Sequence, residues 1–394
     1  MTQPQNNPVP IASTSEPVRL PKHDWILIPA LSLLTILLLF GVCEILARVF
    51  WPTEYSTRCN VDDVVDGDRF KPNCTVRAKI AEGPWITYHY NECGYRSATS
   101  CGPKPPGTIR IVILGSSMSQ ALHVPYEETF FARVSSQLAQ LCNHPVDVQN
   151  LGVPGASPVN AYRRVQEALA LKPDIVLYLV VPYDLKPPVT AKQPVDLGGL
   201  EPNLGEAITR SNLSPLNRLE HILIQSRAVL MAQHVILQDK ENFIRSYMIY
   251  GDKADYLRQP FTPAWQQRFA DLDPIIGDMA DKLHATGVPL IVIAVPSRAE
   301  AALLSSPTLP PHVDPFAFGR EIETIASRHG AAYLDLMETF SHIAHAERLY
   351  YVVDGHVTSD GHKVIADRLL KQLQHDSLSP FSHCVPQQSV ERRP

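Results

Sequence analysis

The chain has 394 residues, of which 45% are hydrophobic and 19% charged, and its formal net charge is −5. This composition excludes a disordered protein, a collagen-like repeat and a strongly basic nucleic-acid-binding protein. The length fits two domains or one decorated domain, and the 35 prolines argue against a long coiled coil.

A polar tail, residues 1–24, precedes an apolar segment. Residues 25–43 carry no charge and are rich in Leu and Ile, and a run of this length can cross a bilayer core of roughly 30 Å as a helix. Trp25 and Trp51 lie near its two ends, where interfacial aromatics are common. The run is too long for a signal peptide and no small-x-small cleavage site follows it. We therefore predict a retained membrane anchor over residues 25–50.

The charges that flank the anchor barely indicate its orientation. Arg19 and Lys22 before the span are matched by Arg48 and Arg58 after it, so the positive-inside rule does not discriminate. A short polar N-terminal tail normally stays in the cytoplasm. We therefore expect residues 52–394 on the extracytoplasmic side of the cell membrane.

Six of the seven cysteines lie beyond the span, and an even number in an exported domain is compatible with three disulfides. None forms a C-x-x-C pair, so zinc and thioredoxin-like sites are not indicated. Sequence proximity favours the pairs Cys59 with Cys74, Cys93 with Cys101, and Cys142 with Cys384. Free buried thiols are the alternative.

Residues 51–107 form a Cys-containing, irregular juxtamembrane segment that ends in a Pro/Gly cluster. Beyond it, strand-like and helix-like patterns alternate. Short, nearly all-apolar runs suit strands buried on both faces of a parallel sheet, and they occur at 109–114, 146–149, 175–181, 290–295 and 331–334. Helical patterns lie between them, around 131–141, 161–171, 262–284 and 361–374.

This alternation predicts a doubly wound, three-layer α/β/α domain over residues 108–375, with a five-stranded, mostly parallel sheet. A Pro/Gly-rich loop and a helical stretch at about 215–250 form a predicted insertion at residues 185–261, and residues 376–394 form a C-terminal tail. Four leucines of the insertion have helical spacing: Leu216, Leu219, Leu223 and Leu230. They could cover an acyl chain, although the simpler interpretation is that they pack onto the domain.

Ligands bind at the carboxyl ends of the strands in such a sheet, so the residues after each strand are candidate site walls. Those residues include Ser117, the glycine-containing run 150–155, Tyr183 and Arg298, and Asp354-Gly355-His356 precedes the last helix. Each signal is weak alone. Together they supply a hydroxyl nucleophile, an imidazole beside a carboxylate, and backbone donors for an oxyanion.

Three of these motifs resemble conserved blocks of the SGNH, or GDSL-like, hydrolase superfamily. They are residues 115–117 (Gly-Ser-Ser), 150–155 (Asn-Leu-Gly-Val-Pro-Gly) and 354–362, which begins Asp-Gly-His. Residues 90–96 and 104–110 also resemble the lead-in of bacterial members that carry one N-terminal membrane anchor. The resemblance covers about residues 88–375 and implies a flavodoxin-like SGNH hydrolase fold.

The resemblance also implies the site residues. Ser117 would be the nucleophile, His356 the general base, and Asp354 the group that orients the imidazole. The backbone N–H groups of Ser117 and Gly152 would form the oxyanion hole, with Tyr183 in place of the usual Asn. No metal and no cofactor is implied.

The sequence departs from the family pattern in three places. Ser116 stands where the family has Asp, Tyr183 stands where it has Asn, and Asp354 precedes His356 by two residues rather than three. That last spacing resembles the alginate O-acetyltransferase-like branch. Two further residues have competing explanations: Arg298 as an anion contact or a structural ion-pair partner, and His362 as a helix-start residue rather than a ligand.

The leading prediction is a membrane-anchored serine esterase that cleaves O-acyl esters, of the O-acetyl type, on an envelope glycan or a small ester. One alternative is an O-acyltransferase that uses the same acyl-enzyme. Another is a non-catalytic glycan-binding or assembly subunit with a degenerate site. The expected partners are the membrane and the acylated substrate, with no nucleic acid, and the oligomeric state is not predicted.

Overall fold

The computed structural model describes residues 21, 23–61, 68–185, 225–249, 251–375 and 380–381. Most of the two predicted tails, much of the predicted insertion and Cys384 lie outside the described residues. The same holds for three of the four insertion leucines, namely Leu216, Leu219 and Leu223.

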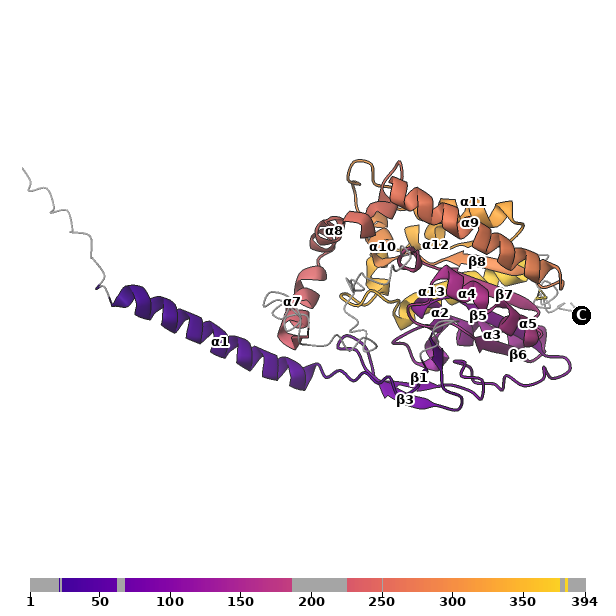
Figure 1. The fold of residues 1–394 in the computed structure, drawn as a ribbon, viewed down its shortest axis with the longest axis horizontal. Helices are drawn as coiled ribbons and strands as arrows, with labels where there is room; N and C mark the ends of the chain where they lie inside the picture. The colour runs from indigo at the N-terminus through magenta and orange to yellow at the C-terminus, as the bar shows by residue number, and fades with distance from the viewer. Residues whose placement is uncertain are drawn as a thin grey trace, which may run out of the picture.

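Five parallel strands form the central sheet, in the order β6-β5-β7-β8-β9 (Figure 1). Their bounds are β5 Ile109–Leu114, β6 Val146–Asn150, β7 Ile175–Val180, β8 Leu290–Ala294 and β9 Ala332–Asp335. The predicted doubly wound α/β/α fold is confirmed. The chain adds β6 on one side of β5 and then adds β7, β8 and β9 on the other side, so a topological switch point lies between β5 and β7. Ligands bind at such a switch point, beyond the carboxyl ends of the strands.

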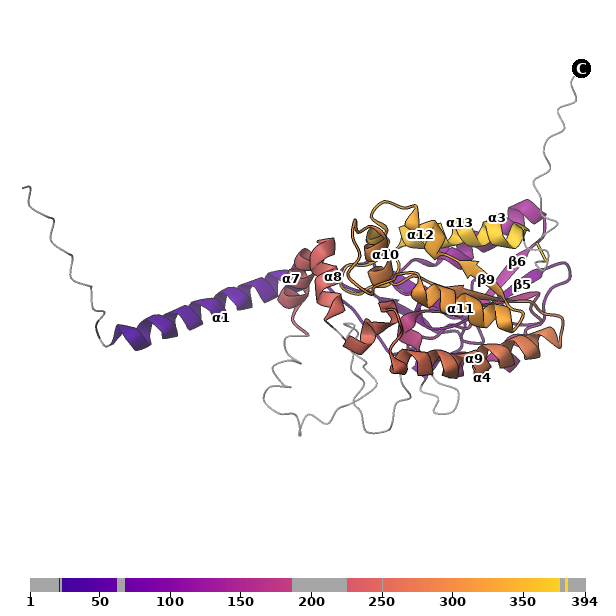
Figure 2. The same cartoon turned by 90° about the horizontal axis from the view of Figure 1, so that it is seen from above.

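Alternating side chains of β5 show how the sheet builds two cores. Ile111 and Ile113 point into one layer, whereas Val112 and Leu114 point into the other. Helices α3 and α13 cover the first layer and α4, α5, α9 and α11 the second, as Figure 2 shows for α3, α13, α4 and α9. Their bounds are α3 Phe130–Cys142, α13 Ser359–His375, α4 Pro158–Arg163, α5 Val165–Ala170, α9 Pro263–His284 and α11 Ala317–Arg328.

The remaining helices of the domain are short. They are α2 Ser117–Gln120, α10 Arg298–Leu304, α12 Met337–Ser341, and the 3₁₀ turns η1 Tyr126–Glu128, η2 Pro182–Asp184, η3 Gly251–Lys253, η4 Asp255–Leu257 and η5 Ala346–Leu349. Phe381, inside the predicted C-terminal tail, is fully buried in the core layer of α3 and α13. That part of the predicted tail therefore belongs to the folded domain.

Two helix predictions were wrong in detail, because local capping was not anticipated. The predicted helix at 161–171 is two helices, α4 and α5, and α4 begins early because Ser157 and Asn160 form a capping box before it. The described part of the helix predicted at 215–250 is also two helices, α7 Arg227–Leu237 and α8 Lys240–Met248. The Asp239 side chain caps α8 and so separates it from α7.

The juxtamembrane segment, predicted as irregular, contains two antiparallel pairs: β1 Asn60–Val61 with β2 Arg69–Phe70, and β3 Thr75–Ala78 with β4 Ile86–His89. The predicted disulfides Cys59–Cys74 and Cys93–Cys101 are confirmed, with Cα separations of 5.7 and 6.2 Å. Cys142 is disulfide-bonded as well.

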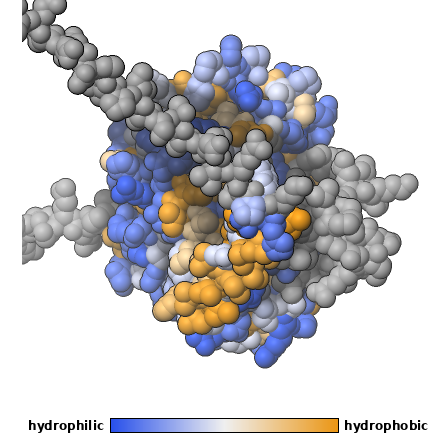
Figure 3. All heavy atoms as spheres, turned by 90° about the vertical axis from the view of Figure 1, so that its left-hand side faces the viewer, coloured by the Kyte–Doolittle hydropathy of each residue, from blue (hydrophilic) through white to orange (hydrophobic). Residues whose placement is uncertain are grey.

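Helix α1, Asp24–Phe50, projects from one end of the α/β domain (Figure 1). It has 27 residues, and its most apolar stretch has a mean hydropathy of 2.7 with none of that stretch buried inside the molecule. At a rise of about 1.5 Å per residue, such a helix is long enough to cross a bilayer. Hydrophobic residues gather on the end of the molecule that carries α1 (Figure 3).

Candidate active site

Ser117 is presented by a sharp turn at the carboxyl end of β5. Gly115 has a φ of +139°, and a Cβ there would lie 2.6 Å from the Leu179 carbonyl oxygen. Only glycine therefore allows the chain to turn this close to β7. Ser117 then opens the four-residue helix α2 and is partly exposed, whereas Ser116 is buried. The turn thus makes Ser117, and not Ser116, the accessible hydroxyl.

The structure brings Ser117, His356 and Asp354 together. The Ser117 Oγ lies 2.8 Å from His356 Nε2, and His356 Nδ1 lies 2.8 Å from Asp354 Oδ1. Asp354 also accepts the His356 backbone N–H at 3.0 Å, which fixes the two residues relative to each other. If Nδ1 carries the proton, Nε2 is free to accept the Ser117 proton.

Two neighbouring imidazoles lower the pKa of the Asp354 carboxylate. Burial acts to raise its pKa, but the neighbouring His356 and His123 outweigh burial and hold the pKa of Asp354 well below its usual value. This direction of the pKa shift favours the ionised form of Asp354. An ionised carboxylate beside Nδ1 is the form that stabilises an imidazolium.

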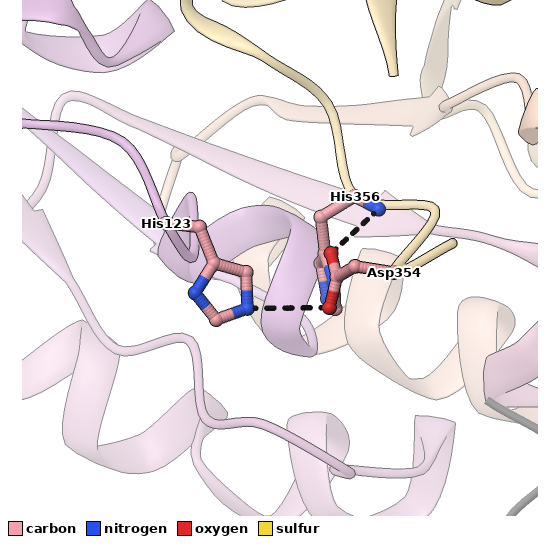
Figure 4. Close-up of side chains that lie close together, drawn as sticks. All are labelled: His123, Asp354 and His356. Atoms are coloured by element: carbon pink, nitrogen blue, oxygen red, sulfur yellow. Dashed lines mark hydrogen bonds and ion pairs between the residues drawn. The ribbon is translucent and has the colours of Figure 1, made fainter. Parts of the chain in front are cut away.

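His123 was not anticipated from the sequence. Its Nε2 lies 3.5 Å from Asp354 Oδ2, and its ring stands edge-on to the His356 ring at a centroid distance of 5.2 Å (Figure 4). The residue is 7% exposed. Its backbone is held in the left-handed region, φ 65°, by hydrogen bonds to the Tyr88 and Tyr351 hydroxyls. The carboxylate of Asp354 thus lies between two imidazoles.

Glu82, which no sequence pattern indicated, holds the loop that carries Asp354. Its carboxylate accepts the backbone N–H groups of Val353 and Asp354 at 3.0–3.1 Å, and it pairs with His234 of α7. Arg298 is bonded to the Val352 carbonyl and, at 2.7 Å, donates to the Leu237 carbonyl at the end of α7. The loop that carries Asp354 is therefore held from both sides. Arg298, 5% exposed, is engaged in structural bonds rather than presented to solvent.

The predicted oxyanion side is organised differently. Gly152 packs against α2 so tightly that a Cβ would lie 2.1 Å from Ser119 Oγ. Its backbone N–H donates to Asn150 Oδ1 at 2.9 Å, while Asn150 Nδ2 donates to the Ser119 carbonyl at 2.8 Å. Asn150 thus ties the Gly152 loop to α2. Its Oδ1 accepts the Gly152 N–H that was predicted to face an oxyanion.

Tyr183 lies in η2, after β7, and 43% of its surface is exposed. Its hydroxyl donates to the Tyr247 hydroxyl of α8 at 2.9 Å. That hydroxyl lies 3.1 Å from the Tyr256 hydroxyl, which in turn lies 2.7 Å from Ser297 Oγ. The Tyr183 proton is thus directed along a chain of hydroxyls, so an oxyanion role would require this hydrogen bond to break.

The remaining predicted positions have structural surroundings. Among the described residues, Ser116 Oγ is buried with no hydrogen-bond partner. His362 stacks on Phe130 at 5.7 Å, and burial lowers the pKa of His362 to about 3. A neutral, stacked imidazole fits a core residue inside α13.

The ligand atoms of His123, Asp354 and His356 lie within 4.8 Å of one another, a spacing that a metal ion could use. However, His356 Nδ1 faces Asp354 and its Nε2 faces Ser117. A metal held by these three residues would have to displace one of these two bonds, so we assign no metal here.

Comparison with known families gives one match: residues 256–394 match the model described as "SGNH hydrolase-like domain, acetyltransferase AlgX". The matched region contains Asp354 and His356 but not Ser117. The chain has no significant match among curated proteins.

A search of solved structures matches TesA, at 14% identity over 67% of this chain and 98% of that one, with a TM-score of 0.37. An acetyl-xylooligosaccharide esterase from Geobacillus Stearmophilus is 12% identical. The match covers 67% of this chain and 93% of the esterase chain, with a TM-score of 0.37. An acetyl xylan esterase has 12% identity, 67% and 98% coverage, and a TM-score of 0.38.

Proposed function

We propose that the chain is a membrane-anchored serine esterase that cleaves O-acyl esters, starting from the match of residues 256–394 to an SGNH hydrolase-like domain. The observation that carries the proposal is the continuous contact Ser117–His356–Asp354, with both distances 2.8 Å. Hydroxyl, imidazole and ionised carboxylate in this order are the parts that acyl transfer requires. The proposed substrates are O-acetyl groups of an envelope glycan or a small ester.

In this mechanism His356 Nε2 takes the proton of Ser117 as the oxygen attacks the ester carbonyl carbon. The tetrahedral intermediate collapses when His356 returns the proton to the leaving alcohol oxygen, and the acyl group stays on Ser117. Water, deprotonated by His356, then attacks the acyl-serine. The bond between the acyl carbon and Ser117 Oγ breaks, His356 returns the proton to Oγ, and the carboxylic acid leaves. Asp354 stabilises the imidazolium that forms in each step.

His123 is part of this proposal as a positioning residue. His123 Nε2 lies 3.5 Å from Asp354 Oδ2 and His356 bonds to Oδ1, so the two imidazoles restrict rotation of the carboxylate. Glu82 and Arg298 hold the backbone of the same loop. A general base held in one orientation loses less free energy to reorganisation on the way to the transition state.

Transfer to a sugar hydroxyl instead of water is a second candidate activity. The observation that favours it is the matched family model, whose description names an acetyltransferase. The chemistry up to the acyl-serine is the same for both activities. They differ in the nucleophile that attacks the acyl-serine, which is water in the esterase and a sugar hydroxyl in the transferase.

We further propose that α1 anchors the domain in the cell membrane and that the domain lies on the extracytoplasmic side. Its length and exposed apolar surface support the anchor, and the disulfides of the juxtamembrane segment support an oxidising compartment. Protease digestion of sealed vesicles of known orientation tests the side. Degradation of the domain only from the cytoplasmic face would contradict the proposal.

The catalytic proposal is tested with a chromogenic acetyl ester and the full-length chain in detergent. Ser117→Ala should abolish turnover, whereas Ser116→Ala, which removes the adjacent buried hydroxyl, should retain most of it. Turnover that survives in Ser117→Ala would overturn the nucleophile assignment. With a radiolabelled acetyl donor and an added glycan acceptor, label in acetate supports the esterase and label in the glycan supports the transferase.

A further inference from the structure

Helix α7 has an apolar face that the folded domain leaves uncovered. Val235 is 66% exposed, Ile236 54% and Met231 38%. Met231 and Val235 are four residues apart and Ile236 follows, so the three side chains occupy one side of the helix. Surface helices normally turn such a face toward the core.

The opposite side of α7 is bonded to the protein. His234 pairs with Glu82 and meets the Trp51 ring edge-on at 4.9 Å. At the far end, the Leu237 carbonyl accepts from Arg298. The exposed side is therefore not a consequence of loose attachment, because the helix is fixed in its orientation.

The first turn of α7 lies on the anchor helix. The Glu44 carboxylate of α1 accepts the Ser226 hydroxyl at 2.7 Å and the backbone N–H groups of Arg227 and Ala228 at 3.2 and 2.9 Å. Glu44 is the first charged residue after the uncharged run 25–43. If α1 crosses the bilayer with that run, Glu44 lies where the hydrocarbon core ends, and so does the start of α7.

The residues next to the contact between Glu44 and the start of α7 are of the types found among lipid headgroups. Arg48, one turn beyond Glu44, keeps 58% of its side chain exposed, and Trp51 follows. Cations and tryptophans are the residues found at this depth. Ile45 and Val49 of α1 are 65% and 66% exposed, so α1 also leaves apolar side chains uncovered next to Glu44 and Arg48.

We propose that α7 is a second membrane contact: a helix that lies in the interface of the leaflet where α1 emerges, with Met231, Val235 and Ile236 in the acyl boundary. The proposal rests on the proposed anchor. An amphipathic helix of this kind inserts its apolar face below the headgroups. Because α7 is bonded through Glu82 and Arg298 to the loop of Asp354, the membrane contact also holds the catalytic loop close to the lipid surface.

The test places an environment-sensitive fluorophore at single cysteines of the full-length chain in lipid vesicles. The background variant is Cys43→Ser, because Cys43 is the free, exposed thiol among the described cysteines. Val235→Cys reports on α7, Leu37→Cys on the middle of α1, and Asp278→Cys on an exposed position of α9. Lipids with a nitroxide at a shallow or a deep acyl position serve as quenchers.

We expect shallow-nitroxide lipid to quench the Val235 probe several-fold more than the Asp278 probe. The Leu37 probe should respond most to the deep nitroxide. A Val235 probe as insensitive as the Asp278 probe, with Leu37 quenched, would overturn the role of α7 while leaving the anchor intact. An unquenched Leu37 probe would instead refute the anchor itself.

Two other occupants of the apolar face give distinct results, and both contradict the proposal. If residues 186–224 of the same chain cover it, the Val235 probe reports an apolar environment that lipid nitroxides do not quench at any protein density. If a second copy covers it, the unquenched apolar signal disappears when the protein is diluted in excess lipid.

Discussion

The two halves of the candidate site differ in how much of their machinery is already in place. On the proton-transfer side, Ser117, His356 and Asp354 are in hydrogen-bond contact, and His123 and Glu82 hold the carboxylate and its loop. On the oxyanion side, the Gly152 N–H and the Tyr183 hydroxyl both donate to other protein groups.

This difference suggests where the rate of such an enzyme would be limited. The general base needs no rearrangement, whereas Gly152 or Tyr183 can join the Ser117 N–H as an oxyanion donor only by exchanging its present partner for the substrate oxygen. Donors that must first break a bond contribute less than donors that are preorganised. Substitutions on the two sides should therefore have unequal effects.

The largest effect is expected for His356→Gln, which removes the general base. We expect kcat/KM for an acetyl ester to fall by about 10⁴-fold or more, because members of such a triad act as a unit. His342→Gln, at an exposed histidine that follows α12 as its C-cap, is the matched control and should be silent. A loss of less than about tenfold in His356→Gln would break the proton-transfer half of the account.

A smaller effect is expected for His123→Leu, which removes the second imidazole from Asp354. Hydrogen bonds to charged groups are worth about 1.5–3 kcal/mol, and at 3.5 Å we expect the lower end, about tenfold in kcat with KM little changed. His123→Gln keeps an N–H donor and should recover most of the loss. Equal losses in both variants would point to packing rather than to the hydrogen bond.

Tyr183→Phe tests the oxyanion side directly. Losing a committed oxyanion donor costs about 10²–10³-fold in kcat. Because the Tyr183 proton is directed to Tyr247, we expect a loss below about tenfold. A loss of about 10²-fold or more in kcat, with folding intact by circular dichroism, would show that Tyr183 turns toward the substrate and takes the place of the missing Asn.

The smallest effect on activity is expected for Glu300→Gln. Glu300 is a buried residue of α10 whose carboxyl group accepts the backbone N–H of Ser297, and the Ser297 hydroxyl ends the chain that begins at Tyr183. Burial raises the pKa of Glu300 to about 8, although bonds to Ser297 oppose the rise. In the unfolded chain a Glu ionises above about 4.3. Between these values the folded protein holds a proton that the unfolded chain lacks, so this group lowers stability as pH rises.

Thermal unfolding of both proteins between pH 5 and 8 measures this contribution. The wild type should lose stability relative to Glu300→Gln by on the order of 1 kcal/mol per pH unit. Parallel stability curves for the two proteins would show that Glu300 is ionised in the folded state. Activity at a fixed pH should be similar in both.

The sequence predicted the features that repeat along the chain or that match known blocks. Five apolar runs gave the strands of the sheet, and their carboxyl ends identified Ser117 and the Asp354–His356 pair. The sequence did not indicate the helix breaks at Arg164 and Asp239. Such breaks depend on whether a nearby side chain or the helix backbone makes the local hydrogen bond.

His123 and Glu82 could not have been identified from the sequence. His123 reaches Asp354 only because residues 121 and 123 adopt left-handed backbone conformations, and neither is a glycine that would have signalled the turn. Glu82 lies 272 residues from Asp354 in a loop whose position depends on the folded juxtamembrane strands. Long-range contacts of this kind leave no local pattern.

Whether Ser117 becomes covalently modified decides the assignment of the site. The full-length chain is incubated with a fluorophosphonate, digested, and analysed by mass spectrometry, with Ser117→Ala and His356→Gln in parallel. We expect one phosphonylated residue, Ser117, no adduct in Ser117→Ala and a strongly slowed reaction in His356→Gln. An unmodified wild type, or an adduct on another serine, would contradict this expectation and favour a binding subunit or a different nucleophile.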